Sequence, residues 1–109
     1  MENALQTYEL KSITVIRGGL EEILQFESAV LVVDTTFLAK SWFIDVSYMK
    51  NLKLLKDLSQ SSNIKVDIIA NTMKGYWLTG EGYIHPNLFA LSAAIKGEGT
   101  LEGYDLILL

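Results

Sequence analysis

The sequence predicts a single α/β domain of 109 residues, ordered β-α-β-α-β-α-β around a mostly parallel sheet of about four strands. Short β-branched or apolar runs alternate along the chain with segments whose apolar residues recur every three or four positions. The run Ala29–Val33 is apolar throughout, as a parallel strand buried on both faces demands. The composition, 50% hydrophobic and 20% charged, suits one small globular core.

The first half of the chain is expected to supply two strands and one helix. Ser12–Ile16 is a β-branched run, and we expect a strand that Gly18 and Gly19 terminate. Residues 20–26 have helical apolar spacing and acids in the first turn, which predicts a short helix. Ala29–Val33 is then the second strand.

The second half is expected to repeat the alternation. Tyr48–Leu58 carries a leucine stripe with its lysines mostly elsewhere, which predicts the clearest helix. Ile64–Ala70 returns as a strand. Pro86–Lys96 is predicted to be a helix, with proline at its first position and Gly97 in the left-handed conformation after its last turn. Tyr104–Leu109 is the last predicted strand, and right-handed crossovers would connect the strands.

Composition and charge exclude several classes of function. The net charge of −4 argues against nucleic-acid binding, which favours a basic face. No apolar run approaches the roughly 20 residues needed to cross a bilayer. The chain has no cysteine, and Met1–Ala4 lacks the features of a signal peptide, so we expect a cytoplasmic protein. Residues 1–11 are interpreted as an extra or poorly ordered segment of the single domain, and the abrupt end of the last strand suggests an excised piece.

Several polar and aromatic side chains follow the ends of the predicted strands. In a parallel sheet these ends meet at one edge, where open α/β proteins bind ligands. We therefore expect one crevice, and its candidate residues are Asp34, Asn71, Thr72, Trp77 and His85. This crevice predicts the alternative function, a stand-alone small-ligand or metal-dependent enzyme.

The metal-dependent version of this alternative centres on Asp34. The stretch Val33–Leu38 resembles the opening of PIN-type nucleases, in which the first strand delivers a metal-binding aspartate. Such a site needs several convergent carboxylates, and the other available acids are Asp45, Asp57, Asp67 and Glu81. The commoner role for an aspartate in the position of Asp34 is to cap a turn.

The glycines and the histidine do not complete a nucleotide or catalytic site. Residues 97–103 have the wrong spacing for a dinucleotide fingerprint, Gly80 and Gly82 lack the third glycine, and Gly18-Gly19 is followed by acids that would repel phosphate. His85 has no evident partner for general-base chemistry, so a structural role is favoured. We expect no cofactor in this chain.

Three stretches of the second half, Ile64–Met73, Thr79–Glu81 and His85–Lys96, follow one another as strand, turn and proline-started segment. In this order they resemble the non-catalytic half of the ketoreductase region of modular polyketide synthases. Tyr48–Leu58 is similar to that region's leucine-rich helix, and Tyr104–Leu109 to its last strand. It implies a Rossmann-like three-layer sandwich without catalytic, cofactor-binding or metal-binding residues. Such a subdomain supports a catalytic half that binds NADPH and reduces β-ketoacyl groups.

The resemblance also implies partners. The first is the catalytic ketoreductase half, in the same chain or in another one. An isolated copy would expose the apolar surface meant for that half, so we expect a homodimer. A third hypothesis, a protein-interaction module, predicts the same exposed surface, and the sequence does not separate the two.

Overall fold

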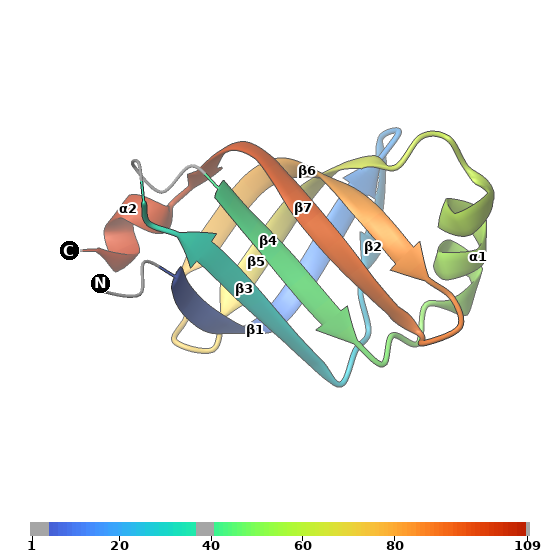
Figure 1. Ribbon diagram of the computed structural model, residues 1–109, viewed down its shortest axis with the longest axis horizontal. Helices are drawn as coiled ribbons and strands as arrows, with labels where there is room; N and C mark the ends of the chain where they lie inside the picture. Colours follow the sequence, from blue (N-terminus) through green and yellow to red (C-terminus); the bar gives the residue numbers. More distant parts are fainter. Residues whose placement is uncertain (1–4, 37–40, 109) are drawn as a thin grey trace.

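The protein is a small antiparallel β-barrel in the computed structural model, which describes residues 5–36 and 41–108 (Figure 1). The elements of these residues are β1 (Leu5–Arg17), β2 (Leu20–Ile23), β3 (Ser28–Asp34), β4 (Ser41–Ser47), α1 (Leu52–Gln60), β5 (Lys65–Thr72), β6 (Trp77–Asn87), β7 (Ser92–Glu102) and α2 (Tyr104–Ile107). Every strand pair among them is antiparallel. The predicted parallel, Rossmann-like sandwich is therefore wrong.

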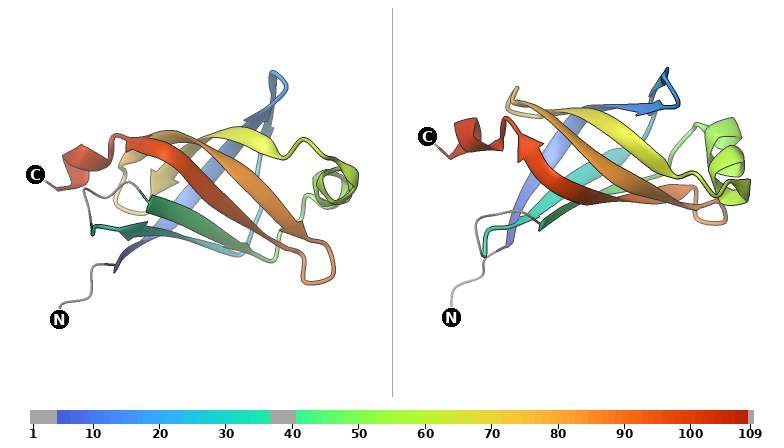
Figure 2. Two further views of the ribbon diagram at one scale, coloured as in Figure 1. Left: turned by 45° about the horizontal axis from the view of Figure 1, so that its top comes forward. Right: turned by 90° about the horizontal axis from the view of Figure 1, so that it is seen from above.

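Six strands close the barrel in the order β1-β3-β4-β7-β6-β5 and back to β1. The long strand β1 makes this closure, because residues Leu5–Glu9 pair with β3 while residues Leu10–Ile16 pair with β5, with a register shift between Leu10 and Ser12. Two three-stranded meanders, β1-β3-β4 and β5-β6-β7, are joined through α1. Because β5 returns to lie beside β1, the first four barrel strands form a Greek key (Figure 2).

The barrel interior is filled by alternate side chains of its strands. In β3, for example, Ala29, Leu31 and Val33 are buried while Val30 and Val32 are partly exposed. The apolar run that predicted a strand buried on both faces is thus a strand with one fully buried face. The buried side chains of the other barrel strands are Leu10, Ile13, Val15, Trp42, Ile44, Val46, Val66, Ile68, Ala70, Thr72, Leu78, Ile84, Ala93, Ile95 and Leu101.

Trp42 occupies the part of the interior where two strands carry glycine. Its indole N–H donates to the carbonyl oxygen of Gly99 at 3.1 Å. A Cβ atom on Gly80 would lie 2.8 Å from the indole ring, and a Cβ atom on Gly97 would overlap the ring itself. Gly97, predicted to end a helix, instead makes room for the largest side chain of the core.

The predicted helix over residues 20–26 is wrong, because Gly18 and Gly19 form a hairpin turn. Their φ angles are +60° and +82°, the left-handed values that a two-residue turn between antiparallel strands requires. The chain therefore folds back on β1 as β2, with Arg17 opposite Leu20. The acids that were interpreted as a helical first turn lie on an exposed strand.

The predicted helix over Pro86–Lys96 is also wrong, since these residues form the end of β6, a turn and the start of β7. Ala93 and Ile95 are buried with the two-residue period of a strand. The Ile84 N–H donates to the carbonyl of Ile64, the residue just before β5. Position 86, two residues further along β6, faces the same side but lies beyond the end of β5. Proline, which has no N–H, fits there because no carbonyl of a neighbouring strand remains to accept a hydrogen bond.

The last prediction for the chain's end is wrong as well. Tyr104–Ile107 is the helix α2, which begins after Gly103 at a φ of +91°; Leu109 lies outside the described residues. Three predicted strands are confirmed: Ser12–Ile16 and Ala29–Val33 lie inside β1 and β3, and Ile64–Ala70 begins one residue before β5. The predicted helix over Tyr48–Leu58 is confirmed as α1, which begins four residues later. Residues 5–11 belong to β1, and residues 1–4 are not described.

Helix α1 packs against one end of the barrel through Leu54, Leu55 and Leu58, which are buried. The residue before it, Asn51, ties the helix to the connection between β2 and β3: its side-chain oxygen accepts from the Gln25 N–H at 2.7 Å, and its amide donates to the Ile23 carbonyl at 3.0 Å. Neither helix of the described residues is long and apolar enough to span a bilayer.

Candidate ligand-binding pocket

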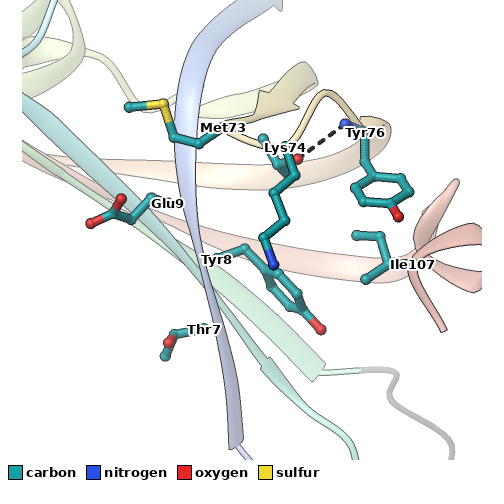
Figure 3. A pocket seen from close by; sticks show the side chains of 8 residues that line it. Thr7, Tyr8, Glu9, Met73, Lys74, Tyr76 and Ile107 are labelled. Atoms are coloured by element: carbon teal, nitrogen blue, oxygen red, sulfur yellow. Dashed lines mark hydrogen bonds between the residues drawn. The ribbon is translucent and has the colours of Figure 1, made fainter.

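A pocket of 370 Å³ opens at the end of the barrel opposite α1, between β1, the β5–β6 turn and α2 (Figure 3). Its volume is within the range of pockets that hold small ligands or single side chains of a partner. The residues that line it are Thr7, Tyr8, Glu9, Thr72, Met73, Lys74, Tyr76 and Ile107. We call it the barrel-end pocket.

The β5–β6 turn gives the pocket a well-defined wall. The buried Thr72 hydroxyl accepts from the Tyr76 N–H at 3.0 Å, and the Thr72 N–H donates to the Tyr76 carbonyl at 2.9 Å. The Met73 N–H donates to the Glu9 carbonyl at 2.9 Å and so attaches the turn to β1. With its backbone fixed in this way, the turn directs the Lys74 side chain toward Tyr8 (Figure 3).

A tyrosine pair joins β1 to α2 beside the pocket. The hydroxyls of Tyr8 and Tyr104 share a hydrogen bond of 2.8 Å, and their rings meet edge to face with centroids 5.7 Å apart. Tyr104 is only 5% exposed. Burial, followed by the hydrogen bond with Tyr8, raises the pKa of Tyr104 above its ordinary value of 10.0. The pair holds α2, and with it Ile107, against the barrel.

This raised pKa predicts that the protein loses stability in alkaline solution. Above pH 10 the unfolded chain releases the Tyr104 proton while the folded chain keeps it. The contribution of Tyr104 to the free energy of unfolding is therefore complete below pH 10 and falls as the pH rises beyond 10. Urea unfolding followed by circular dichroism at pH 8, 9, 10 and 11 measures this slope.

Two phenylalanine variants control the alkaline experiment. Tyr104→Phe should be less stable than the wild type at pH 8, because it lacks the hydrogen bond, and should show a shallower loss above pH 10. Tyr48→Phe removes an exposed hydroxyl at the other end of the barrel and should keep the wild-type slope. Equal slopes for the wild type and Tyr104→Phe would contradict the assignment.

Exposed apolar side chains lie on the elements that form the pocket. Met73 and Tyr76 come from the β5–β6 turn, Trp77 from the start of β6, and Leu106 and Leu108 from α2 and its end; each is between 38% and 62% exposed. The two groups are neighbours, because a Cβ atom on Gly103 would collide with the Trp77 carbonyl. We call these five side chains the apolar rim.

The structure brings together only some of the residues predicted to form a crevice. Thr72 lines the barrel-end pocket, Trp77 lies in its rim, and Asn71 pairs with Trp77 across β5 and β6. Asp34 instead accepts from the Thr36 N–H at 2.9 Å, the turn-capping role, and His85 is exposed near the end of β6. Asp34, Asn71, Thr72 and Trp77 do lie toward one end of the barrel, because β3 and β5 both run antiparallel to β1 and end beside its first half. Only Thr72 of these four lines the pocket, and His85 lies toward the opposite end.

The acidic residues proposed to join Asp34 in a metal site do not form one with it. Asp67 and Glu81 are paired across β5 and β6 on the outer surface, and Glu98 of β7 is paired with Glu81. There Lys65 lies 3.8 Å from Glu81, and Glu98 raises the pKa of Tyr83, first through a hydrogen bond and then through its charge. Among residues 5–36 and 41–108, no group of three or more potential ligands is arranged to hold a metal ion. Residues 37 and 38 of the PIN-like stretch lie outside the described residues.

Sequence reasoning missed the β1 and α2 walls of the pocket. Thr7, Tyr8 and Glu9 fall in the segment that was interpreted as an extra N-terminal piece, and Ile107 in a predicted strand. The extension of the alternating pattern of β1 toward Leu5 was the available signal for the first group. No local signal indicates that residues 96 positions apart, Tyr8 and Tyr104, meet.

Comparison of the chain with protein-family models, curated proteins and solved structures found no match. The ketoreductase assignment therefore stays an untested prediction, and the Rossmann-like fold that it implied is wrong. Function has to be argued from the geometry of the barrel.

Proposed function

We propose that this chain is a non-catalytic protein-binding domain that holds an apolar side chain of another polypeptide in the barrel-end pocket. One observation carries the proposal: a pocket of 370 Å³ lies on the same elements as an apolar rim of five exposed side chains, two of which line it. Large exposed apolar patches on soluble proteins mark interaction sites. The aromatic residues and methionine of the rim are the types enriched in the centres of protein interfaces.

The extent of the surface favours a polypeptide over a small molecule. Five half-exposed large side chains, of which Met73 and Tyr76 also line the pocket, offer roughly 100 Å² each, about 500 Å² in all. A standard protein interface buries about 800 Å² per partner, whereas a small ligand inside the pocket would leave most of the rim exposed. Lys74 and Glu9 carry opposite charges on the pocket wall and would orient a polar backbone segment of the partner.

Two expectations from the sequence stay proposals. The catalytic half of a ketoreductase is a candidate partner on the resemblance alone, and no contact or charge in the barrel supports it. A cytoplasmic location is proposed from the cysteine-free composition.

Titration of the ¹⁵N-labelled protein with N-acetyl-phenylalaninamide tests the pocket. We expect saturable changes in amide chemical shifts at Thr7, Lys74 and Ile107, with weaker binding of N-acetyl-leucinamide and none of N-acetyl-glycinamide. Tyr76→Asp should reduce the affinity at least tenfold by placing a charge in the pocket. Tyr48→Asp, a matched change at an exposed tyrosine of the other end, should leave the affinity unchanged. Shifts that do not saturate, or that occur equally with the glycine compound, would refute the proposal.

A further inference from the structure

The end of the barrel opposite the pocket carries a protruding apolar turn. Between β6 and β7 the chain reads Leu88-Phe89-Ala90-Leu91, and Phe89 is fully exposed, at 101%. Leu88 and Leu91 beside it are each 37% exposed. A fully exposed phenylalanine between two exposed leucines is an unusual feature for a protein surface that only faces water.

This turn is held in one defined shape. The Asn87 side-chain oxygen accepts from the Ala90 N–H at 3.1 Å, and the Leu91 carbonyl accepts from the Met49 N–H at 2.6 Å. Leu91 and Tyr48 both have left-handed backbones, with φ of +52° and +53°. Residues other than glycine keep this costly conformation only where their surroundings impose it, and such positions cluster at functional sites. The backbone from which Phe89 projects is therefore fixed.

The turn and the barrel-end pocket lie toward opposite ends of the molecule. The chain is 40 Å long in its longest dimension, and the views in Figures 1 and 2 place the β6–β7 turn near α1, away from α2 and the β5–β6 turn. One end of each molecule thus carries a protruding apolar turn, while the other carries a pocket beside exposed apolar side chains.

We propose that Phe89 of one copy occupies the barrel-end pocket of the next copy, so that the chain associates head to tail. This inference rests on the proposed function and names its partner as a second copy of the same chain. A cavity of about 150 Å³ holds benzene in a protein core, so a pocket of 370 Å³ has room for the phenyl ring. The apolar rim would then cover Leu88 and Leu91 around the ring.

Both ends of the molecule carry charges of both signs. Beside α1, Lys53 lies with Asp57 and with Glu22, which accepts a hydrogen bond from the Asn51 amide. At the other end, Glu9 and Lys74 both line the pocket. Charge therefore does not select the orientation of the contact, which rests on shape and apolar area.

The shapes favour a head-to-tail contact over a two-fold dimer. A two-fold contact through the pocket end would place two hollows face to face and leave both Phe89 rings in water. A head-to-tail contact uses both apolar surfaces and gives a ring or an open chain. The rim and the turn together bury about 1,000 Å² in all, which is near the lower limit of specific interfaces and predicts weak, reversible association.

Sedimentation velocity of the full chain over a hundredfold range of concentration tests this inference. The weight-average mass of the wild type should rise with concentration. Phe89→Ser and Tyr76→Asp should each reduce self-association at least tenfold, with circular dichroism showing that each remains folded. Mixed together, the two variants should form a one-to-one heterodimer that grows no further, because each supplies the surface that the other lacks.

The outcomes separate the inference from the proposed function. A wild type that stays monomeric, a Phe89→Ser variant that associates like the wild type through a two-fold contact, or variants that do not combine would each overturn the head-to-tail contact. If N-acetyl-phenylalaninamide still binds the pocket in that case, the proposed function stands and only the identity of the partner is wrong. Should Tyr76→Asp fail to fold, Trp77→Asp in the rim replaces it in the mixing experiment.

Discussion

Replacing Gly97 by alanine is expected to lower the free energy of unfolding by about 3 kcal/mol, the upper end of the usual cost of overpacking a core. The new methyl group would overlap the indole ring of Trp42. That ring is 2% exposed and is fixed by its hydrogen bond to the Gly99 carbonyl, so it has little freedom to move aside. Urea unfolding followed by circular dichroism measures the loss.

A double-mutant cycle identifies the cause of this loss. Trp42→Ala by itself should lower the free energy of unfolding by about 3–5 kcal/mol, because it removes the largest side chain of the core and leaves a cavity. In that background Gly97→Ala should cost almost nothing, since the overlap is gone, and the coupling energy should approach the whole cost of the single glycine change. Thr100→Ala, an exposed change on the same strand, should stay within about 0.5 kcal/mol of the wild type. A Gly97→Ala cost that persists without the indole would contradict this account.

The sequence predicted correctly those strands and the helix whose own residues favour that structure. Ser12–Ile16, Ala29–Val33 and Ile64–Ala70 are β-branched or apolar runs, and each forms part of a strand. The leucine spacing of Tyr48–Leu58 produces a helix because three of its leucines meet the barrel end. In each case the local preference and the tertiary environment agree.

The predictions were wrong where the local sequence fits both a helix and a hairpin, and where pairing with a distant strand selects the hairpin. Leu88, Leu91 and Ile95 have helical spacing, yet the first two lie in a turn and the third faces the barrel interior from β7. Gly18-Gly19 is compatible with the start of a helix and with a hairpin turn, and pairing with β1 selects the turn. Once both hairpins are misread as helices, the remaining strands appear to need parallel crossovers, and the whole fold class follows the error.

The pocket was only partly predictable for the same reason. Thr72 and Trp77 were noticed because polar and aromatic residues follow an obvious strand. Tyr8 and Ile107 reach the pocket through barrel closure by β1 and through the docking of α2, contacts between the two ends of the chain that no short stretch of sequence encodes.

The second large effect is expected from Leu55→Ala in α1, which should lower the free energy of unfolding by about 3 kcal/mol. Leu55 is fully buried against the barrel, and deletion of a buried leucine side chain costs about 2–5 kcal/mol. Leu52→Ala on the same helix is the matched control: that side chain is 48% exposed, so its loss should cost less than about 1 kcal/mol.

The position of α1 makes this comparison informative about the rest of the molecule. The helix is the connection that carries the chain from β4 to β5 and so completes the Greek key. It also begins three residues after Met49, whose N–H donates a hydrogen bond to the Leu91 carbonyl of the β6–β7 turn. A loosened helix should therefore increase amide exchange in that turn, measured by hydrogen–deuterium exchange, while Thr72 and Tyr76 at the opposite end keep their protection. Equal costs for Leu55→Ala and Leu52→Ala would show that the helix is not packed on the barrel, and the fixed backbone of the β6–β7 turn would lose its support.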